Sequence, residues 1–391
     1  MRRKTGIDRR EFMRRGTAAG AAALAARGAS GAAPAAKIKV GVIGCGSVSR
    51  KYLPHLAGCA HAELASACDI KPERAAQAAK KFKIPNHYPQ IDAMLAGAPF
   101  DLLVNLTFMQ EHGRLNKIAL EAGKHVWSEK PLANTYAEGA ALVELAKKKG
   151  VRIWGAPTVV NSPQFEFMAR AINARKLGAL AAAHASYGHL GPDWSAFFYE
   201  KLGGSMPDLG VYNLVTLTGL LGPARAVTAM LSVVTPMRTV GDKGEVRVEA
   251  EDNAMVLLDH GKGVISHVQC GFNYFTPFQH DDTQQDHHTI SIIGREGSLH
   301  LCGYDWAPHG VDIATADSRS FTRRATGAQG YCWEQGASVI CECLATGKEP
   351  RWTAEHALHV VEIMEAARES QEHGRRVALK STFPWPVVEG V

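Results

Sequence analysis

The pattern of hydrophobic and polar residues in the first part of the chain differs from the pattern in the rest. Between residues 37 and 155, short apolar runs alternate with amphipathic stretches. Strands are predicted over 37–43, 62–68, 101–106, 125–128 and 151–154, and helices up to residue 56 and over 71–82, 111–122 and 136–149. Strands that alternate with helices indicate βαβ units, so the predicted fold is α/β with a doubly wound parallel sheet of the Rossmann type.

The pattern changes near residue 155, where long stretches rich in strand-forming residues begin. Helices are predicted over 165–176, 213–221 and 354–372, and strands over 180–187, 226–234, 245–259, 263–275 and 288–301. These segments indicate a C-terminal α+β domain with a large, mostly antiparallel open sheet. A chain of 391 residues exceeds what one core usually serves. Two domains, 37–155 and 156–391, are therefore expected after a leader of residues 1–36.

The formal charge of +6 is confined to the leader. Residues 1–36 contain eight basic and two acidic side chains, which accounts for the whole excess. The remainder of the chain is formally neutral and offers no basic patch, so nucleic acid is not expected as a partner.

The leader has the features of an export signal. The string DRREFM at residues 8–13 precedes the weakly apolar stretch 17–26, and small residues follow at 33–35. This arrangement resembles the twin-arginine signal of bacteria, and the apolar stretch is too short to span a membrane as an ordinary helix. It implies export by the twin-arginine machinery to the periplasm or cell envelope. An accidental arginine pair on a tail is the alternative, and cleavage or retention as an anchor stays open.

The cysteines do not predict a metal site or a disulfide framework. Their spacing matches neither pattern, and a polar segment at 280–288 also fits no metal motif. We therefore predict no metal and interpret the cysteines as small core residues. The eight are Cys45, Cys59, Cys68, Cys270, Cys302, Cys332, Cys341 and Cys343.

A glycine-rich turn after the first predicted strand indicates a dinucleotide site. Gly44 and Gly46 allow a tight turn and a close approach to a pyrophosphate, and Ser49 replaces the third glycine of the usual motif. The predicted cofactor-binding residues of this turn are Gly44, Gly46, Ser47, Val48 and Ser49. A strand, turn and helix without a ligand is the alternative.

Asp69, at the end of the second predicted strand, indicates which dinucleotide is bound. It follows Ser49 by 20 residues, where an acidic side chain meets the ribose hydroxyls. A carboxylate accepts hydrogen bonds from a free 2′-hydroxyl and repels a 2′-phosphate, so NAD is predicted. Lys71 nearby leaves NADP as an alternative.

Several further motifs, taken together, resemble one enzyme family. They are Thr107 with His112 five positions later, AGKHV at 122–126 leading into EKP at 129–131, and GGSMPDLGVY at 203–212. With the glycine turn, they make nearly all of the chain after the leader resemble the glucose-fructose oxidoreductase, inositol dehydrogenase and rhizopine-catabolism family, Gfo/Idh/MocA. The resemblance implies a C-terminal domain for substrate binding and oligomerisation. It also implies that Thr107, His112, Glu129 and Lys130 lie at the cofactor, and that Lys130, Asp208 and Tyr212 form the catalytic group.

The sequence departs from this family at two places. Most relatives carry histidine where Tyr212 stands, although those similar to glucose-fructose oxidoreductase carry tyrosine. Asp69 departs from the NADP preference of that subgroup. Each catalytic residue also has a structural alternative: Lys130 as a surface lysine, Asp208 as a helix N-cap and Tyr212 as a buried aromatic.

The chemistry of these residues can be argued beside the resemblance. Oxidising a hydroxyl requires a base within hydrogen-bond reach, and Lys130 serves as one if it is neutral. If residues 208–212 are helical, the four-residue spacing of Asp208 and Tyr212 puts both on one face. Tyr212 can then relay a proton while Asp208 orients the lysine or the sugar.

Substrate contacts are predicted in the loop that follows the first strand of the second domain. His189 and Trp194 there are side chains that hydrogen-bond or stack on sugars, and a structural loop is the alternative. The strands around Val256 and Val268 are expected to form an open sheet face, which in this family commonly makes the interface of a dimer or tetramer.

These observations together predict an exported oxidoreductase. It would transfer a hydride between a sugar or polyol hydroxyl and a nicotinamide cofactor, or from one sugar to another. The cofactor should be tightly bound, because the cell envelope is not expected to supply free NAD. Two alternatives remain: a redox-neutral NAD-dependent glycosidase or lyase, and a non-catalytic, cofactor-stabilised binding protein.

Overall fold

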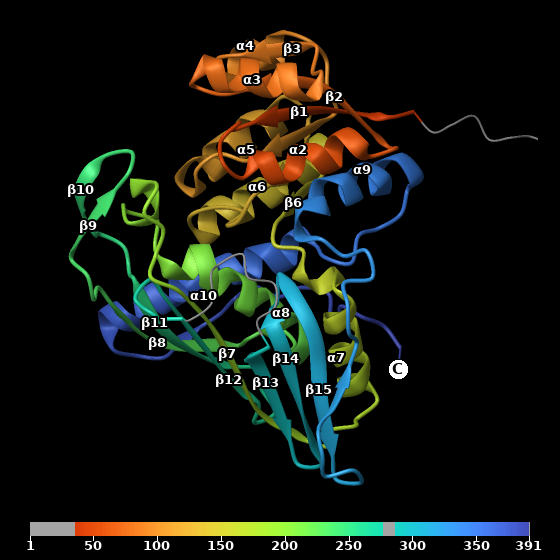
Figure 1. Cartoon of the computed structure of the whole chain (residues 1–391), viewed down its shortest axis with the longest axis vertical. Helices are drawn as coiled ribbons and strands as arrows, with labels where there is room; N and C mark the ends of the chain where they lie inside the picture. The colour runs from red at the N-terminus through yellow and green to blue at the C-terminus, as the bar shows by residue number, and fades with distance from the viewer. Residues whose placement is uncertain (1–35, 277–285, 391) are drawn as a thin grey trace, which may run out of the picture. The chain divides into compact units, whose positions relative to one another are not determined.

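The computed structural model of the chain describes residues 36–276 and 286–390 (Figure 1). The predicted leader and most of the polar segment at 280–288 lie outside the described residues. Residues 37–391 form one unit. None of the described helices combines the length and the apolar composition that crossing a membrane requires.

The first sheet has six strands, all parallel, in the order β3-β2-β1-β4-β5-β6. The order reverses between β1 and β4, which makes their carboxyl ends the switch point of a doubly wound sheet. The strands are β1 (Ile38–Ile43), β2 (Ala62–Cys68), β3 (Asn86–Tyr88), β4 (Leu102–Asn105), β5 (His125–Ser128) and β6 (Ile153–Gly155). The predicted Rossmann sheet is confirmed, with β3 as a strand that the sequence pattern missed.

Helices connect these strands, and the bounds of α6 show how local sequence sets where a helix begins and ends. They are α2 (Ser49–Gly58), α3 (Pro72–Phe82), α4 (Ile91–Ala96), the short η1 (Met109–Glu111), α5 (His112–Glu121) and α6 (Tyr136–Lys149). The side chain of Thr135 accepts a hydrogen bond from the Glu138 amide and so caps α6, and Gly150 ends it in the left-handed region.

The second sheet has nine strands in the order β16-β15-β14-β13-β7-β12-β11-β8-β17. β7 and β12 run parallel and every other pair is antiparallel, so the predicted mostly antiparallel sheet is confirmed. The strands are β7 (Leu180–Gly188), β8 (Ala226–Ser232), β11 (Asn253–Asp259), β12 (Ile265–Gly271), β13 (His288–Gly294), β14 (Gly297–Tyr304), β15 (Ala307–Thr315), β16 (Thr322–Arg324) and β17 (Val377–Ala378).

Two predicted strands of this part were wrong, because each is divided in the structure. The stretch 245–259 splits into β10 (Gly244–Arg247), which pairs with β9 (Met237–Val240) in a separate ribbon, and β11. The buried Asp252 stands between them, and its carboxylate accepts hydrogen bonds from the amides of Val234 and Thr235. The stretch 288–301 is a hairpin of β13 and β14, turned at residues 295 and 296 between two glycines.

Helices cover one face of the second sheet. They are α7 (Pro163–Asn173), α8 (Val211–Leu221) and α10 (Ala354–His373), preceded by the short η2 (Val159–Asn161), η3 (Ala196–Phe198) and η4 (Met206–Gly210). α10 packs on β8, and α8 packs on β7 and β12. Alternate residues of these strands face the other side, where large apolar side chains are exposed: Met230, Met255, Leu257, Ile265 and Ile293.

One helix from the end of the chain joins the first domain. After η5 (Trp333–Gln335), helix α9 (Gly336–Thr346) packs against α2, β1 and β2, and Figure 1 shows α9 beside α2. Residue 336 must be glycine, because a Cβ there would lie 2.4 Å from the ring of Trp127 on β5. Trp127 is fully buried and also packs edge-on against Trp352, with ring centroids 5.9 Å apart.

Candidate functional site

A cleft of about 2540 Å³ lies over the carboxyl ends of β1 and β4. The loops that follow β1, β2, β4 and β5 line one side of it. The other side is lined by the end of β7, the loop after it, and residues 327, 328 and 331–334. This is where open parallel sheets bind ligands. All predicted site residues line this cleft: Gly44, Gly46, Ser47, Val48, Ser49, Asp69, Thr107, His112, Glu129, Lys130, His189, Trp194, Asp208 and Tyr212.

The glycines of the first turn have different physical reasons to be glycine. Gly44 has a φ of +87°, and a Cβ there would lie 2.6 Å from the carbonyl of Leu106 and 2.7 Å from the amide of Thr107. Glycine is therefore required at residue 44 by the backbone conformation and by the neighbouring backbone atoms. Gly46 has ordinary φ, and the nearest atom to an added Cβ would be a guanidinium nitrogen of Arg74, 3.8 Å away. The space beside Gly46 is thus left open by the protein, as a bound pyrophosphate requires.

The N-terminal end of α2, where the helix dipole is positive, lies at the same turn. Among the described residues, no side chain caps the start of α2. The Ser49 hydroxyl instead donates back to the carbonyl of Gly46 over 2.7 Å, which tightens the turn. Uncapped amides at a helix start bind anions, so this turn fits the phosphates of a dinucleotide.

Asp69 is held by the backbone at the end of β2. Its carboxylate accepts hydrogen bonds from the amides of Cys45 and Lys71, each over 2.8 Å. The side chain is buried, with 6 % of the residue exposed, yet it lines the cleft. Arg74 lines the cleft nearby. An anchored carboxylate at this place fits a ribose with free hydroxyls.

A chain of hydrogen bonds connects the loops after β4 and β5. The Thr107 hydroxyl donates to Asn105 over 2.7 Å, and the two ring nitrogens of His112 lie 2.7 Å from the carbonyl of Pro131 and 3.0 Å from that of Thr107. Burial lowers the pKa of His112, which favours the neutral ring, in which one nitrogen donates a hydrogen bond to one of these carbonyls. His112 therefore ties the two loops together, since both of its nitrogens face the protein.

Glu129 anchors the loop that carries the lysine. Its carboxylate accepts a hydrogen bond from the Tyr52 hydroxyl over 2.7 Å and one from the Lys130 amide over 2.9 Å. Only 6 % of Glu129 is exposed. Because Tyr52 lies on α2, this contact couples the helix at the glycine turn to the position of Lys130.

Lys130 and Asp208 meet across the cleft. The Lys130 Nζ lies 2.7 Å from Asp208 Oδ1 and 2.8 Å from the Asp208 carbonyl oxygen. The same nitrogen lies 5.3 Å from the centroid of the Tyr212 ring. Residues 206–210 form a turn of π-helix that leads directly into α8. The segment 208–212 is thus helical, and both Asp208 and Tyr212 lie toward Lys130. π-Turns are frequent at functional sites.

Burial keeps the Tyr212 phenol protonated. Loss of solvent raises its pKa well above the usual value, and the charges of Glu129 and Asp208 raise it further. Tyr187 lies edge-on to it, with ring centroids 6.1 Å apart, and accepts a hydrogen bond from the Trp306 indole over 3.0 Å. Tyr212 is thus available as a hydrogen-bond donor to an oxygen in the cleft.

Aromatic side chains form the remaining wall of the cleft. His189 accepts a hydrogen bond from the Gly191 amide over 2.9 Å, which fixes the imidazole ring in the loop. Trp194 is 46 % exposed. Sequence reasoning missed Trp306 and the segment Tyr331–Glu334, which also line the cleft. The aromatic-rich string YCWE at 331–334 was the available signal, although no pattern placed it near residues 44–49.

An anchored lysine beside a turn that can hold a dinucleotide is the arrangement of a nicotinamide-dependent oxidoreductase. Comparison with known proteins gives the family. Residues 38–156 match the NAD-binding Rossmann domain of the Gfo/Idh/MocA oxidoreductases, and residues 165–300 match a C-terminal domain of the same family. The chain belongs to the Gfo/Idh/MocA oxidoreductase family and is an enzyme of that type.

Similar proteins act on sugars and related molecules. The D-apiose dehydrogenase of Paraburkholderia graminis is 28 % identical over 362 residues, covering 88 % of this chain and 90 % of that protein. A levoglucosan dehydrogenase in complex with NADH and L-sorbose has a TM-score of 0.77 at 22 % identity, covering 88 % and 99 %. The aldose-aldose oxidoreductase of Caulobacter crescentus complexed with glycerol has a TM-score of 0.75 at 22 % identity, covering 88 % and 100 %. At these identities the two solved structures show the shared fold.

Proposed function

We propose that this protein is an exported oxidoreductase that transfers a hydride between a sugar or polyol hydroxyl and a tightly bound NAD. The observation that carries the proposal is the Lys130–Asp208 pair beside the protonated Tyr212, in the cleft that Gly46 and Asp69 also line. The glycine turn and the start of α2 would hold the pyrophosphate, and Asp69 the ribose. Bound NAD supplies the acceptor for the hydride.

Side chains of the protein would transfer the proton that accompanies the hydride. A substrate oxygen near Lys130 Nζ and the Tyr212 hydroxyl accepts hydrogen bonds from both. When a carbonyl is reduced, the Lys130 ammonium gives its proton to that oxygen, and when a hydroxyl is oxidised, the amine takes the proton. Asp208 holds the lysine in place through two contacts, and Tyr212 orients the oxygen without losing its own proton.

The exported location is a proposal that rests on the leader sequence. If the enzyme works outside the cytoplasm, a cofactor that dissociates is lost, so turnover requires a second substrate that reoxidises the bound NADH. A second sugar meets that requirement. The D-apiose dehydrogenase relative supports a sugar as the first substrate.

The test is a sugar panel on the purified full chain and on two lysine variants. One sugar should raise the absorbance of reduced nicotinamide in the bound cofactor, and a second should lower it. Lys130→Ala should cut turnover about 10²–10⁴-fold, the usual range for acid–base catalysis, while NAD stays bound. Lys117→Ala, which changes an exposed lysine of α5, should have no effect.

Three results would overturn the proposal. Loss of the cofactor on gel filtration contradicts tight binding. Undiminished turnover by Lys130→Ala contradicts the catalytic assignment. Net hydrolysis of aryl glycosides with no change in cofactor absorbance would make the enzyme a redox-neutral glycosidase instead.

We also propose that copies of the chain pair through the open face of the second sheet. Met230 on β8 and Met255 on β11 are register partners on this face, and they are 77 % and 45 % exposed. Adjacent exposed apolar side chains on one face are typical of an interface between copies.

A further inference from the structure

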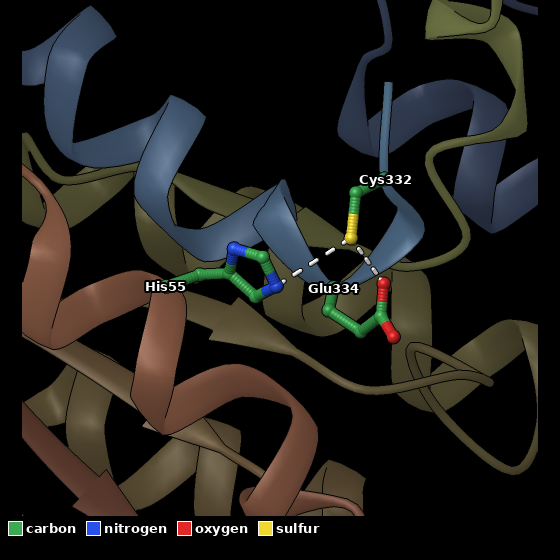
Figure 2. A group of neighbouring side chains, drawn as sticks. All are labelled: His55, Cys332 and Glu334. Carbon is green, nitrogen blue, oxygen red and sulfur yellow. Dashed lines mark hydrogen bonds between the residues drawn. The ribbon is translucent and has the colours of Figure 1, made fainter. Parts of the chain in front are cut away.

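Three side chains from distant parts of the sequence converge at the edge of the cleft. His55 lies on α2, Cys332 directly precedes η5, and Glu334 lies within η5. Figure 2 shows the imidazole, the thiol and the carboxylate pointing toward one another. One ligand atom from each lies within 4.8 Å of the others, and all three residues are partly buried.

We propose that His55, Cys332 and Glu334 bind a divalent transition metal of the zinc type. Imidazole nitrogen, thiolate sulfur and carboxylate oxygen are all ligands that Zn²⁺ takes. Three protein ligands leave a fourth position for water, so the site is of the open kind.

The distance between two of the ligand atoms matches tetrahedral zinc. With Zn–S of about 2.3 Å and Zn–N of about 2.0–2.1 Å, tetrahedral angles place sulfur and nitrogen about 3.5 Å apart. His55 Nε2 lies 3.5 Å from Cys332 Sγ. The Cys332 thiol donates a close hydrogen bond to the Glu334 carboxylate. Zinc would replace that proton, and the carboxylate would move away from the sulfur, because two ligands of one tetrahedral zinc lie about 3.5 Å apart.

The charges of the site also suit a dication. A thiolate and a carboxylate carry two negative charges, which balance Zn²⁺, and the imidazole binds in its neutral form.

A second trio in the chain has similar residue types but a different electrostatic setting. His288, Cys302 and Asp312 also lie within ligand distance of one another. There the guanidinium of Arg323 binds both carboxylate oxygens of Asp312, at 2.5 and 3.0 Å. That position already holds a positive charge, so this trio serves as an internal control.

A metal at the first trio would fasten the cleft wall to α2. Trp333, between Cys332 and Glu334 in the sequence, packs edge-on against Tyr52 with ring centroids 5.8 Å apart. Tyr52 precedes His55 by three residues on α2, and its hydroxyl binds Glu129. The metal would thus hold residues 332–334, which line the cleft, onto the helix that begins at the glycine turn.

Metal titration of the purified full chain, without a histidine tag, tests this proposal. After chelator treatment and dialysis, the wild type should bind one equivalent of Zn²⁺, and Co²⁺ should give a thiolate-to-metal charge-transfer band in the near ultraviolet. Zn²⁺ should also raise the melting temperature, because it binds the folded state. Cys332→Ser and His55→Gln should weaken binding at least about 10-fold.

The controls separate loss of a ligand from loss of the fold. His288→Gln should bind Zn²⁺ as the wild type does. Glu334→Gln keeps the size of the side chain but removes the carboxylate, and it should retain the wild-type melting temperature without metal while binding Zn²⁺ more weakly. Equal Zn²⁺ affinity in the wild type and the Cys332, His55 and Glu334 variants would overturn the site, as would a Co²⁺ complex without the thiolate band.

Discussion

The two glycines of the first turn give the sharpest test of the cofactor site. In Gly44→Ala, the new methyl would meet the backbone of Leu106 and Thr107 at 2.6–2.7 Å, at a φ of +87°. Positive φ costs an L-residue roughly 1–2 kcal/mol, and an overpacked contact adds about 1–3 kcal/mol. A loss near 3 kcal/mol, at about 2–4 °C for each kcal/mol, lowers the melting temperature by roughly 6–12 °C.

Gly46→Ala is the matched substitution with the opposite expectation. Its methyl would lie 3.8 Å from its nearest neighbour, so the melting temperature should change by no more than about 1–2 °C. The methyl occupies the space we assign to the pyrophosphate, so NAD affinity should fall at least about 10-fold, which is about 1.4 kcal/mol.

Thermal unfolding followed by circular dichroism, and NAD titration by calorimetry after the cofactor has been removed, measure both effects. Unchanged stability in Gly44→Ala would refute the account of the turn. Unchanged NAD affinity in Gly46→Ala would refute the placement of the cofactor.

Three further predictions concern other parts of the unit. Asp69→Ala should weaken NAD binding about 10–150-fold, as loss of a hydrogen bond to a charged group does. It should also move the cofactor preference toward NADP, because Arg74 remains. Equal loss of affinity for both cofactors in a binding titration would contradict this. Burial raises the pKa of Asp305 from 3.8 to about 6. Ionising this carboxyl therefore lowers the stability of the folded state by up to about 3 kcal/mol. This loss is absent below pH 3.8 and complete above pH 6. Asp305→Asn should therefore gain stability relative to the wild type in melts at pH 8 compared with pH 4, and a constant difference between the two proteins would argue against it. Met255→Glu, on the open sheet face, should turn dimers or tetramers into monomers in light scattering, whereas unchanged mass would place the interface elsewhere.

The parts of the fold that could be predicted are those whose burial leaves a strong pattern. β1, β2 and β4 are covered on both sides, so they appear as short apolar runs between helices. β3 has three residues and α4 has six, too few for a period to emerge. The hairpin of β13 and β14 was taken as one strand because its short turn interrupts an otherwise continuous apolar stretch.

The site was predictable only as separate pieces. Lys130 and Asp208 are 78 residues apart, and only the family resemblance suggested that they meet. His55 and Cys332 are 277 residues apart, so the prediction of no metal followed from spacing that could not reveal them as neighbours. The interpretation of the cysteines as core residues is confirmed for the buried Cys68, Cys270, Cys302, Cys341 and Cys343. Cys45 and Cys59 are half-buried and pack against the core, whereas the half-buried Cys332 lines the cleft.

Helix α9 makes the first domain depend on the end of the chain. Residues beyond 332 cover Trp127 and pack against α2. Most of the protein must therefore be synthesised before the core of the nucleotide-binding domain is complete. A fragment that stops at residue 155 should expose the Trp127 ring and aggregate, although it contains the entire six-stranded sheet. An incomplete chain could then not enclose a cofactor, because the helix at the glycine turn would lack its covering residues. The interlocked helix would in this way tie completion of the cofactor site to completion of the chain.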